Sequence, residues 1–295
     1  MQKTKGFTGR KSRPILSDFV IGGVLVLLAL TIIFPFYNAV MISLVPMHVY
    51  VRNPVILWPE QIVLDSYKFV LTYSSIWNGL KVTGFLTLVG TLYNMLLTVI
   101  TAYAMTKTFP GKKIMQAVMI IPLYFGGGLV PYYLLIRDLG LMNTVWSMLL
   151  PTGLNYTYML VVMRYMEGLP LELEEAAEID GAGQIRILFV VVLPMALPIL
   201  ATYTLYYAVD RWNEWWNGML FIKTVSKQPL QLILRNLVQD STDASLDAQA
   251  NGMTESYSDA IKMASIIVTM LPIMILYPFL QRFFLSGLTA GAVKG

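Results

Sequence analysis

Long runs without a charged residue recur along the chain and limit what it can fold into. A helix that crosses a membrane needs about 20 consecutive apolar residues, and charge-free runs of that order are found at 19–51, 82–106, 114–136, 139–163, 187–209 and 263–281. We therefore expect six membrane-spanning helices, near residues 19–44, 80–106, 114–136, 143–165, 195–221 and 262–282. The predicted fold class is an all-α, polytopic membrane protein whose single domain covers residues 1–295.

Composition excludes several other classes of protein. Only 13% of the residues are charged and 56% are hydrophobic, whereas ordinary soluble domains are about 25% charged. The chain has no cysteine and one histidine, His48, so disulfides, thiol catalysis and histidine-based metal sites are not expected. It also lacks the G-x-x-x-x-G-K-[ST] loop that cradles phosphates. We therefore expect no ATP hydrolysis by this chain, no catalytic residues and no metal site.

The basic residues sort onto alternate loops, which indicates the orientation in the membrane. Cytoplasmic segments of membrane proteins carry an excess of Lys and Arg. Such residues gather before the first span, between spans two and three, between spans four and five, and after span six: Lys3, Lys5, Arg10, Lys11 and Arg13; Lys107, Lys112 and Lys113; Arg164 and Arg186; Arg282 and Lys294. Both ends are therefore predicted to be cytoplasmic. The net charge of +4 then needs no nucleic-acid partner.

The first apolar run has an alternative interpretation as a signal peptide. It is too long for the apolar core of such a peptide, and no small-residue cleavage site follows it. We therefore expect a retained helix. The segments 45–78 and 223–260 are then external. Within the second, the polar stretch 239–258 is either a solvated linker or a loop that contacts an external partner.

A polar segment between the fourth and fifth spans has the signals of a short cytoplasmic helix. Pro170 suits a helix start, and the acidic residues after it favour the positive end of the helix dipole. Gly181 supplies a stop, because glycine readily adopts the left-handed conformation that ends many helices. These signals predict the helix, and they say nothing of what it contacts.

This segment, residues 167–194, resembles the EAA coupling loop of ABC-importer permeases, which reads EAA, two variable residues, DGA, and an apolar stretch ending in LP. The matching residues are Glu175, Ala176, Ala177, Asp180, Gly181, Ala182, Leu193 and Pro194. One position differs, because Leu188 followed by Phe189 stands where the family usually has Phe. Both residues are apolar, so the helix should persist. The resemblance implies that this helix seats in a cleft of a cytoplasmic ATPase subunit.

The end of the chain resembles the tail of one subgroup of these permeases, the maltose type of oligosaccharide importers. The tail, residues 283–295, ends in Gly291, Ala292, Val293, Lys294 and Gly295. The resemblance implies that these residues contact the ATPase subunits. The alternative is that a glycine-rich terminus is simply frayed. A further likeness is to permeases of acidic-oligosaccharide systems, of the aldouronate or alginate type.

The fifth span contains candidates for a substrate path, because ionisable residues at membrane depth usually face a cavity or a partner. The candidates are Tyr203, Tyr207, Asp210, Arg211, Trp212, Asn213 and Glu214. Arg211 must be paired, and Asp210, Glu214 or a substrate carboxylate are its candidate partners. The neighbouring Trp215 and Trp216 suit either sugar faces or an interfacial aromatic belt.

The third span carries Pro122, the run Gly126 to Gly128, and Pro131. This density predicts a broken or kinked helix. In a membrane such a break is tolerated where protein or a water-filled cavity covers the freed backbone groups. The break serves either a cavity or close helix packing.

Taken together, the resemblance implies a type I ABC-importer permease: one membrane subunit of an ATP-driven, binding-protein-dependent oligosaccharide importer in the bacterial cytoplasmic (inner) membrane. The partners implied are a second homologous permease, two cytoplasmic ATPase subunits and an extracellular or periplasmic solute-binding protein. This chain would bind no cofactor, and ATP and Mg would be held by the ATPase subunits. The alternative is a self-contained secondary transporter or channel, which would need an internal coupling site such as paired repeats.

Overall fold

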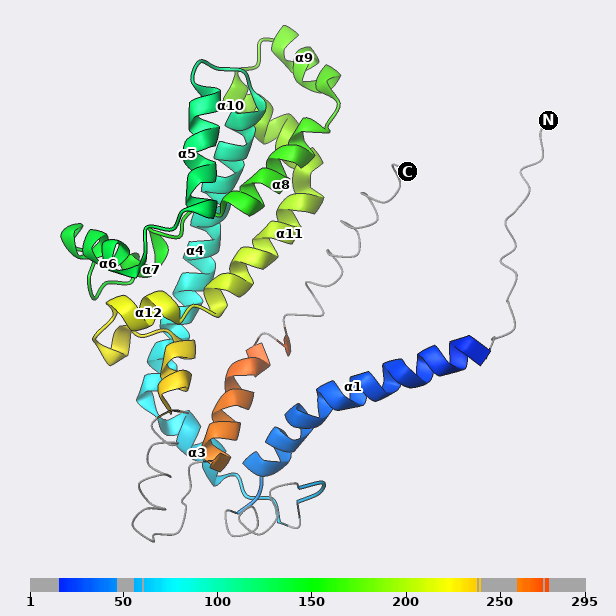
Figure 1. The fold of residues 1–295 in the computed structure, drawn as a ribbon, viewed down its shortest axis with the longest axis vertical. Coiled ribbons are helices and arrows are strands. Elements are labelled where there is room, and N and C mark those ends of the chain that lie inside the picture. The colour runs from blue at the N-terminus through cyan, green and yellow to red at the C-terminus, as the bar shows by residue number, and fades with distance from the viewer. Residues whose placement is uncertain are drawn as a thin grey trace.

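The computed structural model describes residues 16–46, 56–59, 61–237, 239, 259–272 and 274–275. Every regular element in these ranges is a helix (Figure 1). The helices are α1 (Leu16–Ser43), α3 (Asp65–Thr72), α4 (Ser74–Thr106), α5 (Lys112–Tyr124), α6 (Leu129–Asp138), α7 (Trp146–Leu149), α8 (Tyr156–Glu167), α9 (Leu171–Ile179), α10 (Gln184–Ile187), a π-helical turn (Leu188–Val192), α11 (Leu193–Trp212), α12 (Trp216–Phe221) and a 3₁₀ turn (Val225–Lys227). Residues 230–237 and 259–272 are also helical. The expected tail contacts, residues 291–295, lie outside the described residues.

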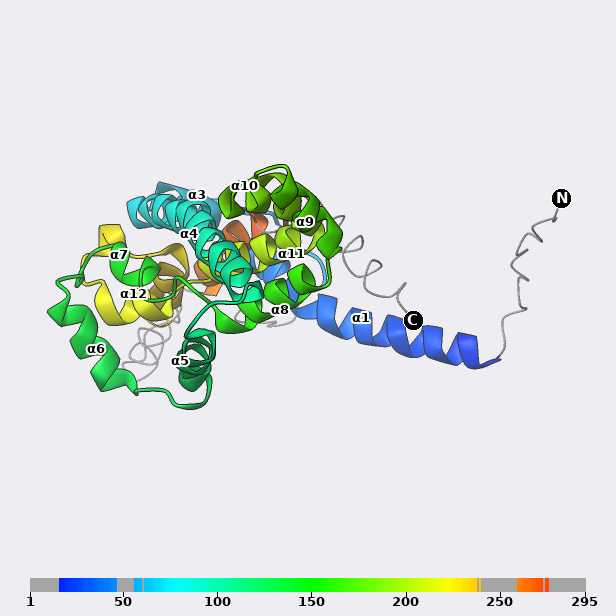
Figure 2. The same cartoon turned by 90° about the horizontal axis from the view of Figure 1, so that it is seen from above.

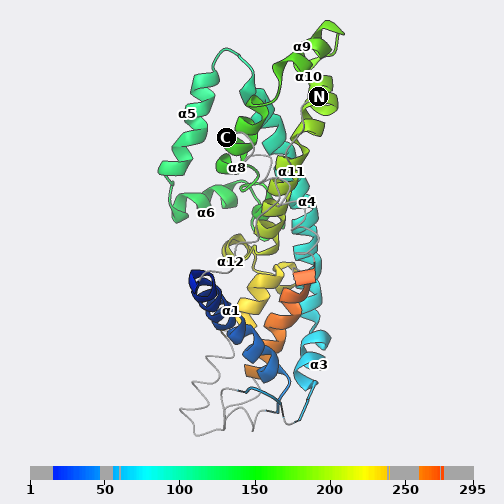
Figure 3. The ribbon, with the colours of Figure 1, turned by 90° about the vertical axis from the view of Figure 1, so that its right-hand side faces the viewer.

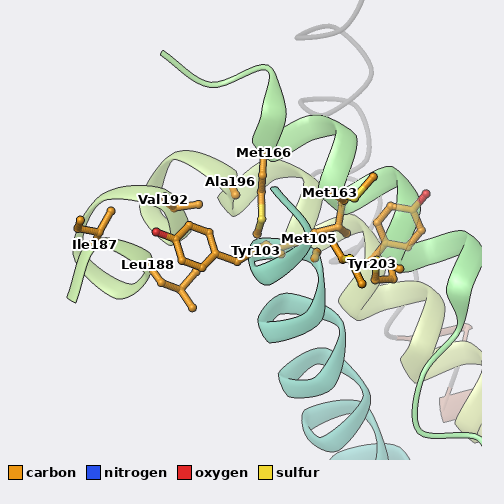
Figure 4. Close-up of a cluster of buried hydrophobic side chains, with 13 residues drawn as sticks. Tyr103, Met105, Met163, Met166, Ile187, Leu188, Val192, Ala196 and Tyr203 are labelled. Atoms are coloured by element: carbon orange, nitrogen blue, oxygen red, sulfur yellow. The ribbon is translucent and has the colours of Figure 1, made fainter. Parts of the chain in front are cut away.

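Helix α4 is the axis of the molecule, and α8 and α11 pack along it (Figures 1 and 3). The largest buried cluster joins the C-terminal half of α4 to α8, α10, the π-helical turn and α11 (Figure 4). Its members are almost all apolar: Ala102, Tyr103, Met105, Met159, Val162, Met163, Met166, Ile187, Leu188, Val192, Ala196, Leu200 and Tyr203. The chain therefore has a packed core of its own at the end that carries α9.

Three described segments are long and apolar enough to cross a membrane: Phe19–Ser43, Ser74–Thr106 and Gln184–Phe221. The expected break in the third span is confirmed, since α5 ends at Tyr124 and α6 begins at Leu129, after Gly128 with φ 85°. The prediction of one continuous helix over 143–165 is wrong, because residues 150–155 separate α7 from α8. The fifth span is likewise interrupted, at residues 213–215.

Two helices present apolar side chains with little packing inside the chain. Helix α1 points away from the other helices in Figures 1 and 2, and none of its most apolar window is buried. Helix α5 also contributes no buried side chain. Apolar surface of this extent is stable only against lipid or another protein. These two helices are therefore the surfaces of the subunit that need an apolar environment.

Candidate functional site

Helix α9 and the turn after it have the geometry that the sequence predicts. Pro170 is the N-cap, and Gly181 adopts φ 80°. The amide of Ala182 donates to the carbonyl of Ala177 at 2.9 Å, and the amide of Gly181 donates to the carbonyl of Glu178 at 2.9 Å. This pair of bonds is the Schellman motif, which requires the left-handed conformation at its glycine. The turn therefore fixes the direction in which the chain returns to the membrane.

One face of this segment is exposed and apolar. Helix α9 projects from the end of the molecule, at the top of Figure 1. Ile179 is 87% exposed, and Ile185 is 76% exposed. By contrast, Ala177 and Ala182 pack against the buried cluster, and Leu193 does so as well. Of the matching residues, Ala177, Ala182 and Leu193 hold the segment on the subunit. Ala176 is exposed, and together with the exposed isoleucines it leaves a surface for a partner.

Polar contacts tie this segment to the end of α4. Lys107 forms an ion pair with Glu174, and its ammonium lies 4.7 Å from the centre of the Tyr103 ring. The Tyr103 hydroxyl donates to Gln184 Oε1 at 2.9 Å, and Gln184 Nε2 donates to Glu178 Oε1 at 2.6 Å. We call these five residues the α4–α9 network. It links α9 and Gln184 to the end of α4.

The charge of Lys107 is stable. Burial lowers the pKa of Lys107, but its hydrogen bonds to Glu174 and Tyr103 and the charge of Glu174 outweigh burial, so the pKa is raised above its ordinary 10.5. A raised pKa means that the ammonium stabilises the fold below its ordinary pKa, and that this contribution is lost only as the pH rises through the higher value. The ion pair with Glu174 therefore persists through physiological pH.

The one departure from the coupling-loop pattern has a simple structural consequence. Leu188 is 5% exposed and belongs to the buried cluster (Figure 4), whereas Phe189 is 57% exposed. Leu188 thus occupies the inward position, and the chain forms a π-helical turn there before α11. The helix persists, as expected.

A cavity of about 380 Å³ lies beside the C-terminal half of α11. Its volume is within the range of ligand pockets. It is lined by Asn94, Pro151, Thr152, Leu154, Asn155, Tyr207, Asp210, Arg211 and Glu214. Four of the predicted path residues therefore line one cavity: Tyr207, Asp210, Arg211 and Glu214. Tyr203 belongs instead to the buried cluster, Trp212 packs on a second cluster, and Asn213 bonds to the carbonyl of Val209 at 2.9 Å.

Arg211 is 4% exposed, and its hydrogen bonds all go to uncharged oxygens. Its Nε donates to Asn94 Oδ1 at 2.9 Å. One terminal nitrogen donates to the Met148 carbonyl at 2.7 Å and to Thr152 Oγ1 at 2.8 Å. The other donates to the carbonyls of Thr152 at 2.9 Å and Leu149 at 3.5 Å. The described residues give it no ion pair with a carboxylate, so two of its three candidate partners, Asp210 and Glu214, do not have that role.

These bonds hold the interruption between α7 and α8 against α4. We call Arg211, Asn94, Met148, Leu149 and Thr152 the arginine network. Asn94 Nδ2 also donates to the carbonyls of Thr152 and Gly153, each at 2.7 Å. The carbonyls of residues 148–153 would otherwise lack helical partners. The network therefore explains how a break in the chain is tolerated at this depth.

Two glycines permit this close approach. A Cβ on Gly90 would lie 2.8 Å from Leu149 Cδ2 and 3.0 Å from Arg211 Nε. A Cβ on Gly153 would lie 2.7 Å from the ring of Tyr93. Both distances are shorter than ordinary van der Waals contacts, so the absence of side chains at these positions lets α4, α11 and the interruption meet.

The two carboxylates have their own partners. The Tyr158 hydroxyl donates to Asp210 Oδ2 at 3.1 Å. Glu214 accepts the amide of Asn217 and its Nδ2, each at 3.0 Å. Glu214 thus caps the start of α12 beyond the interruption at 213–215. Trp215 lies against the guanidinium of Arg235, 4.2 Å from the ring centre, which favours packing over sugar contact for that ring.

Sequence reasoning missed several residues of this site. Asn94, Thr152, Asn155 and Tyr158 were not predicted. Asn94 is polar in the middle of a charge-free run, and this was an available signal, because a buried amide needs partners. Pro151 and Gly153 within the expected fourth span were a weaker signal, since they mark the interruption.

The described part of the chain therefore combines helices that are long and apolar enough to span a membrane, a projecting helix with an exposed apolar face, and a polar cavity beside a broken span. These features fit a membrane-embedded permease. The chain belongs to the family of binding-protein-dependent transport system inner membrane components, whose sequence model matches residues 95–290. The family is the membrane subunit of ABC transporters and not the ATPase. Membership implies partners such as ATPase subunits and a substrate-binding protein.

Relatives share nearly the whole length of the chain. The polygalacturonan/rhamnogalacturonan transport system permease protein YtcP of Bacillus subtilis is 33% identical over 282 residues, which cover 95% of this chain and 99% of that protein. The arabinooligosaccharides transport system permease protein AraQ of Halalkalibacterium halodurans is 27% identical over 292 residues, or 97% of this chain and 99% of that protein. A chain from a bacterial ABC transporter involved in the import of the acidic polysaccharide alginate superposes with a TM-score of 0.82 at 28% identity, covering 93% of this chain and 100% of that one.

Proposed function

We propose that this chain is one of two related permease subunits of an importer that moves an oligosaccharide across the bacterial inner membrane by alternating access. Two cytoplasmic ATPase subunits supply the energy and hold ATP and Mg, and an external solute-binding protein delivers the sugar. The chain spans the membrane six times with both ends in the cytoplasm, and residues 1–295 form one permease domain. The sugar class rests on the transport systems named for the relatives.

The exposed face of α9, joined to α4 through the α4–α9 network, supports this proposal most strongly. A self-contained transporter has no use for a projecting helix that exposes apolar side chains beside its glutamates. Here Glu175, Ala176, Ala177, Asp180, Gly181 and Ala182 form the part that seats in the ATPase, and Leu193 and Pro194 return the chain to the membrane. Residues Gly291, Ala292, Val293, Lys294 and Gly295 are proposed to contact the ATPase as well.

The apolar surfaces of α1 and α5 suit the second permease subunit and the bilayer. Both helices expose large apolar side chains, such as Leu27 at 66% and Ile114 at 72%. ATP-driven closure of the ATPase subunits would displace α9, and α4 would move with it. Since α4 also carries Asn94, the displacement reaches the arginine network and the cavity beside it.

Reconstitution in proteoliposomes tests the function. The complete complex should accumulate an oligosaccharide only when ATP and the binding protein are both present. The matched control replaces the catalytic ATPase partner with an ATPase-inactive one and keeps this chain unchanged. Accumulation by this chain without ATPase subunits would contradict the proposal and favour a secondary transporter.

A further inference from the structure

Two carboxylates, Asp210 and Glu214, and one guanidinium line the cavity, so the charge that it offers to a solute is negative on balance. Arg211 is the one cation among the residues that line it. A guanidinium has five N–H donors and no acceptor. The structure gives Arg211 five hydrogen bonds, all to oxygens of the protein. No donor of Arg211 is left for a ligand, and the residue is only 4% exposed.

Asp210 and Glu214 differ from Arg211 both in exposure and in the hydrogen-bonding capacity that they have left. The side chain of Asp210 is exposed and that of Glu214 is half-buried. Each carboxylate has about four acceptor positions, and the bonds from Tyr158 and Asn217 use only some of them. Their remaining lone pairs can accept hydrogen bonds from hydroxyl groups, which a sugar supplies in numbers. The cavity therefore offers acceptors and negative charge.

We propose that Asp210 and Glu214 determine substrate specificity in this subunit: they bind the hydroxyl groups of the passing sugar and repel a carboxylate, while Arg211 acts only as a positioning residue for the cavity wall. This inference rests on the proposed function, since it concerns the sugar path of that importer. An oligosaccharide built from uronic acids would turn its carboxylates away from this wall. The arginine that the sequence offers as a partner for an acidic sugar does not have that role.

A charge-selective thiol probe tests the charge of the cavity without any substrate. The chain has no cysteine, so Pro151→Cys places a single thiol at one of the exposed residues of the lining. The assembled complex is treated with a cationic and an anionic methanethiosulfonate, and each rate is divided by the rate of that reagent with free cysteine. The cationic reagent should react roughly three- to tenfold faster on this scale. Asp210→Asn with Glu214→Gln leaves Arg211 as the one charged residue of the lining, so the cationic preference should disappear or reverse. Asp138→Asn, at an exposed residue, should leave it unchanged.

Three other outcomes of the thiol experiment would overturn the inference. A faster anionic reagent would show that Arg211 is available to solutes. A cationic preference that survives removal of both carboxylates would show that they do not set the charge. No reaction with either reagent would show that the cavity is closed to solutes. Because no sugar is involved, these results are independent of whether the importer carries oligosaccharides.

A matched pair of sugars then tests specificity. Trigalacturonate and its methyl ester have the same rings and differ in charge. For each complex, the half-saturating concentration for binding-protein-dependent uptake of the acid is divided by that of the ester. This ratio is compared between the parent and each variant, and the preference of the binding protein cancels because it is the same in all of them. Asp210→Asn and Glu214→Gln should each lower this ratio roughly three- to tenfold. An unchanged or raised ratio would overturn the assignment. Uptake of neither sugar by the parent complex, with the thiol result upheld, would count against the oligosaccharide function instead.

Discussion

Replacement of Arg211 by glutamine should act on transport through a loss of stability of the subunit. Glutamine has two N–H donors in place of five and cannot reach all the oxygens of the arginine network. An unsatisfied buried acceptor costs about 1–3 kcal/mol. Among the described residues, Asn94 Oδ1 and the carbonyl of Leu149 accept only from Arg211, whereas the carbonyl of Met148 also accepts from the Thr152 hydroxyl at 3.0 Å. Water from the adjoining cavity replaces part of the loss. We therefore expect about 3 kcal/mol, a large fraction of the roughly 5–15 kcal/mol of a typical domain.

The assay is thermal unfolding of the assembled complex, followed by size-exclusion chromatography of the heated sample. On the scale of soluble domains, a loss of about 3 kcal/mol lowers the midpoint by roughly 6–12 °C. Arg137→Gln is the matched control, because Arg137 is exposed and pairs only with the neighbouring Asp138. It should change stability by less than about 1 kcal/mol.

Double variants distinguish the arginine network from an ion pair. If Arg211 were the partner of an acid, Asp210→Asn or Glu214→Gln would relieve the stranded charge and restore the folded yield of Arg211→Gln. We expect no restoration, since the acceptors of Arg211 are uncharged. Restored yield in either double variant, or normal stability of Arg211→Gln alone, would refute the reasoning.

Three further predictions concern the helices around these networks. Gly90→Ala should destabilise the complex by about 1–3 kcal/mol through overpacking, whereas Gly84→Ala on the same helix meets nothing within 4 Å and should be neutral or stabilising, as thermal unfolding will show. Gly181→Val should leave the complex assembled but uncouple ATP hydrolysis from uptake, because valine resists φ 80°. Gly183→Ala, at φ −72°, is the control and should remain coupled. Normal uptake by the Gly181→Val variant would count against a role of the turn in coupling. Lys107→Gln should lower stability by about 1–2 kcal/mol. The loss should be the same at about pH 6 and about pH 9, since Lys107 stays charged below its raised pKa. A loss that differs between these two pH values would contradict the persistence of the ion pair.

Local signals in the sequence were sufficient to predict the helix α9 and its turn. Pro170, the acidic first turn and Gly181 each act within a few residues, and the structure has the N-cap, the helix and the left-handed glycine where these signals lie. The long apolar run of α4 was equally clear, because its hydropathy needs no knowledge of neighbours.

The interruption at 150–155 could not be predicted in the same way. Pro151 and Gly153 are its only local signals, and its freed carbonyls are satisfied by residues distant in sequence. Asn94 lies 58 residues from Thr152, and Arg211 lies 63 residues from Met148. The sequence correctly indicated that Arg211 needs partners. Only the tertiary structure shows that they are carbonyl, amide and hydroxyl oxygens.

The contact between α9 and the ATPase is the centre of this account, and cross-linking measures it directly. Ile179→Cys places a thiol on the side chain that is 87% exposed at the end of α9, in a chain without other cysteines. A thiol–amine cross-linker of short span should join it to the ATPase subunit in the intact membrane, with a yield that changes when ATP is added. Ser226→Cys, exposed in the 3₁₀ turn far from α9, should give no such product. Equal cross-linking from Ser226→Cys, or none from Ile179→Cys in a complex that transports, would contradict the account.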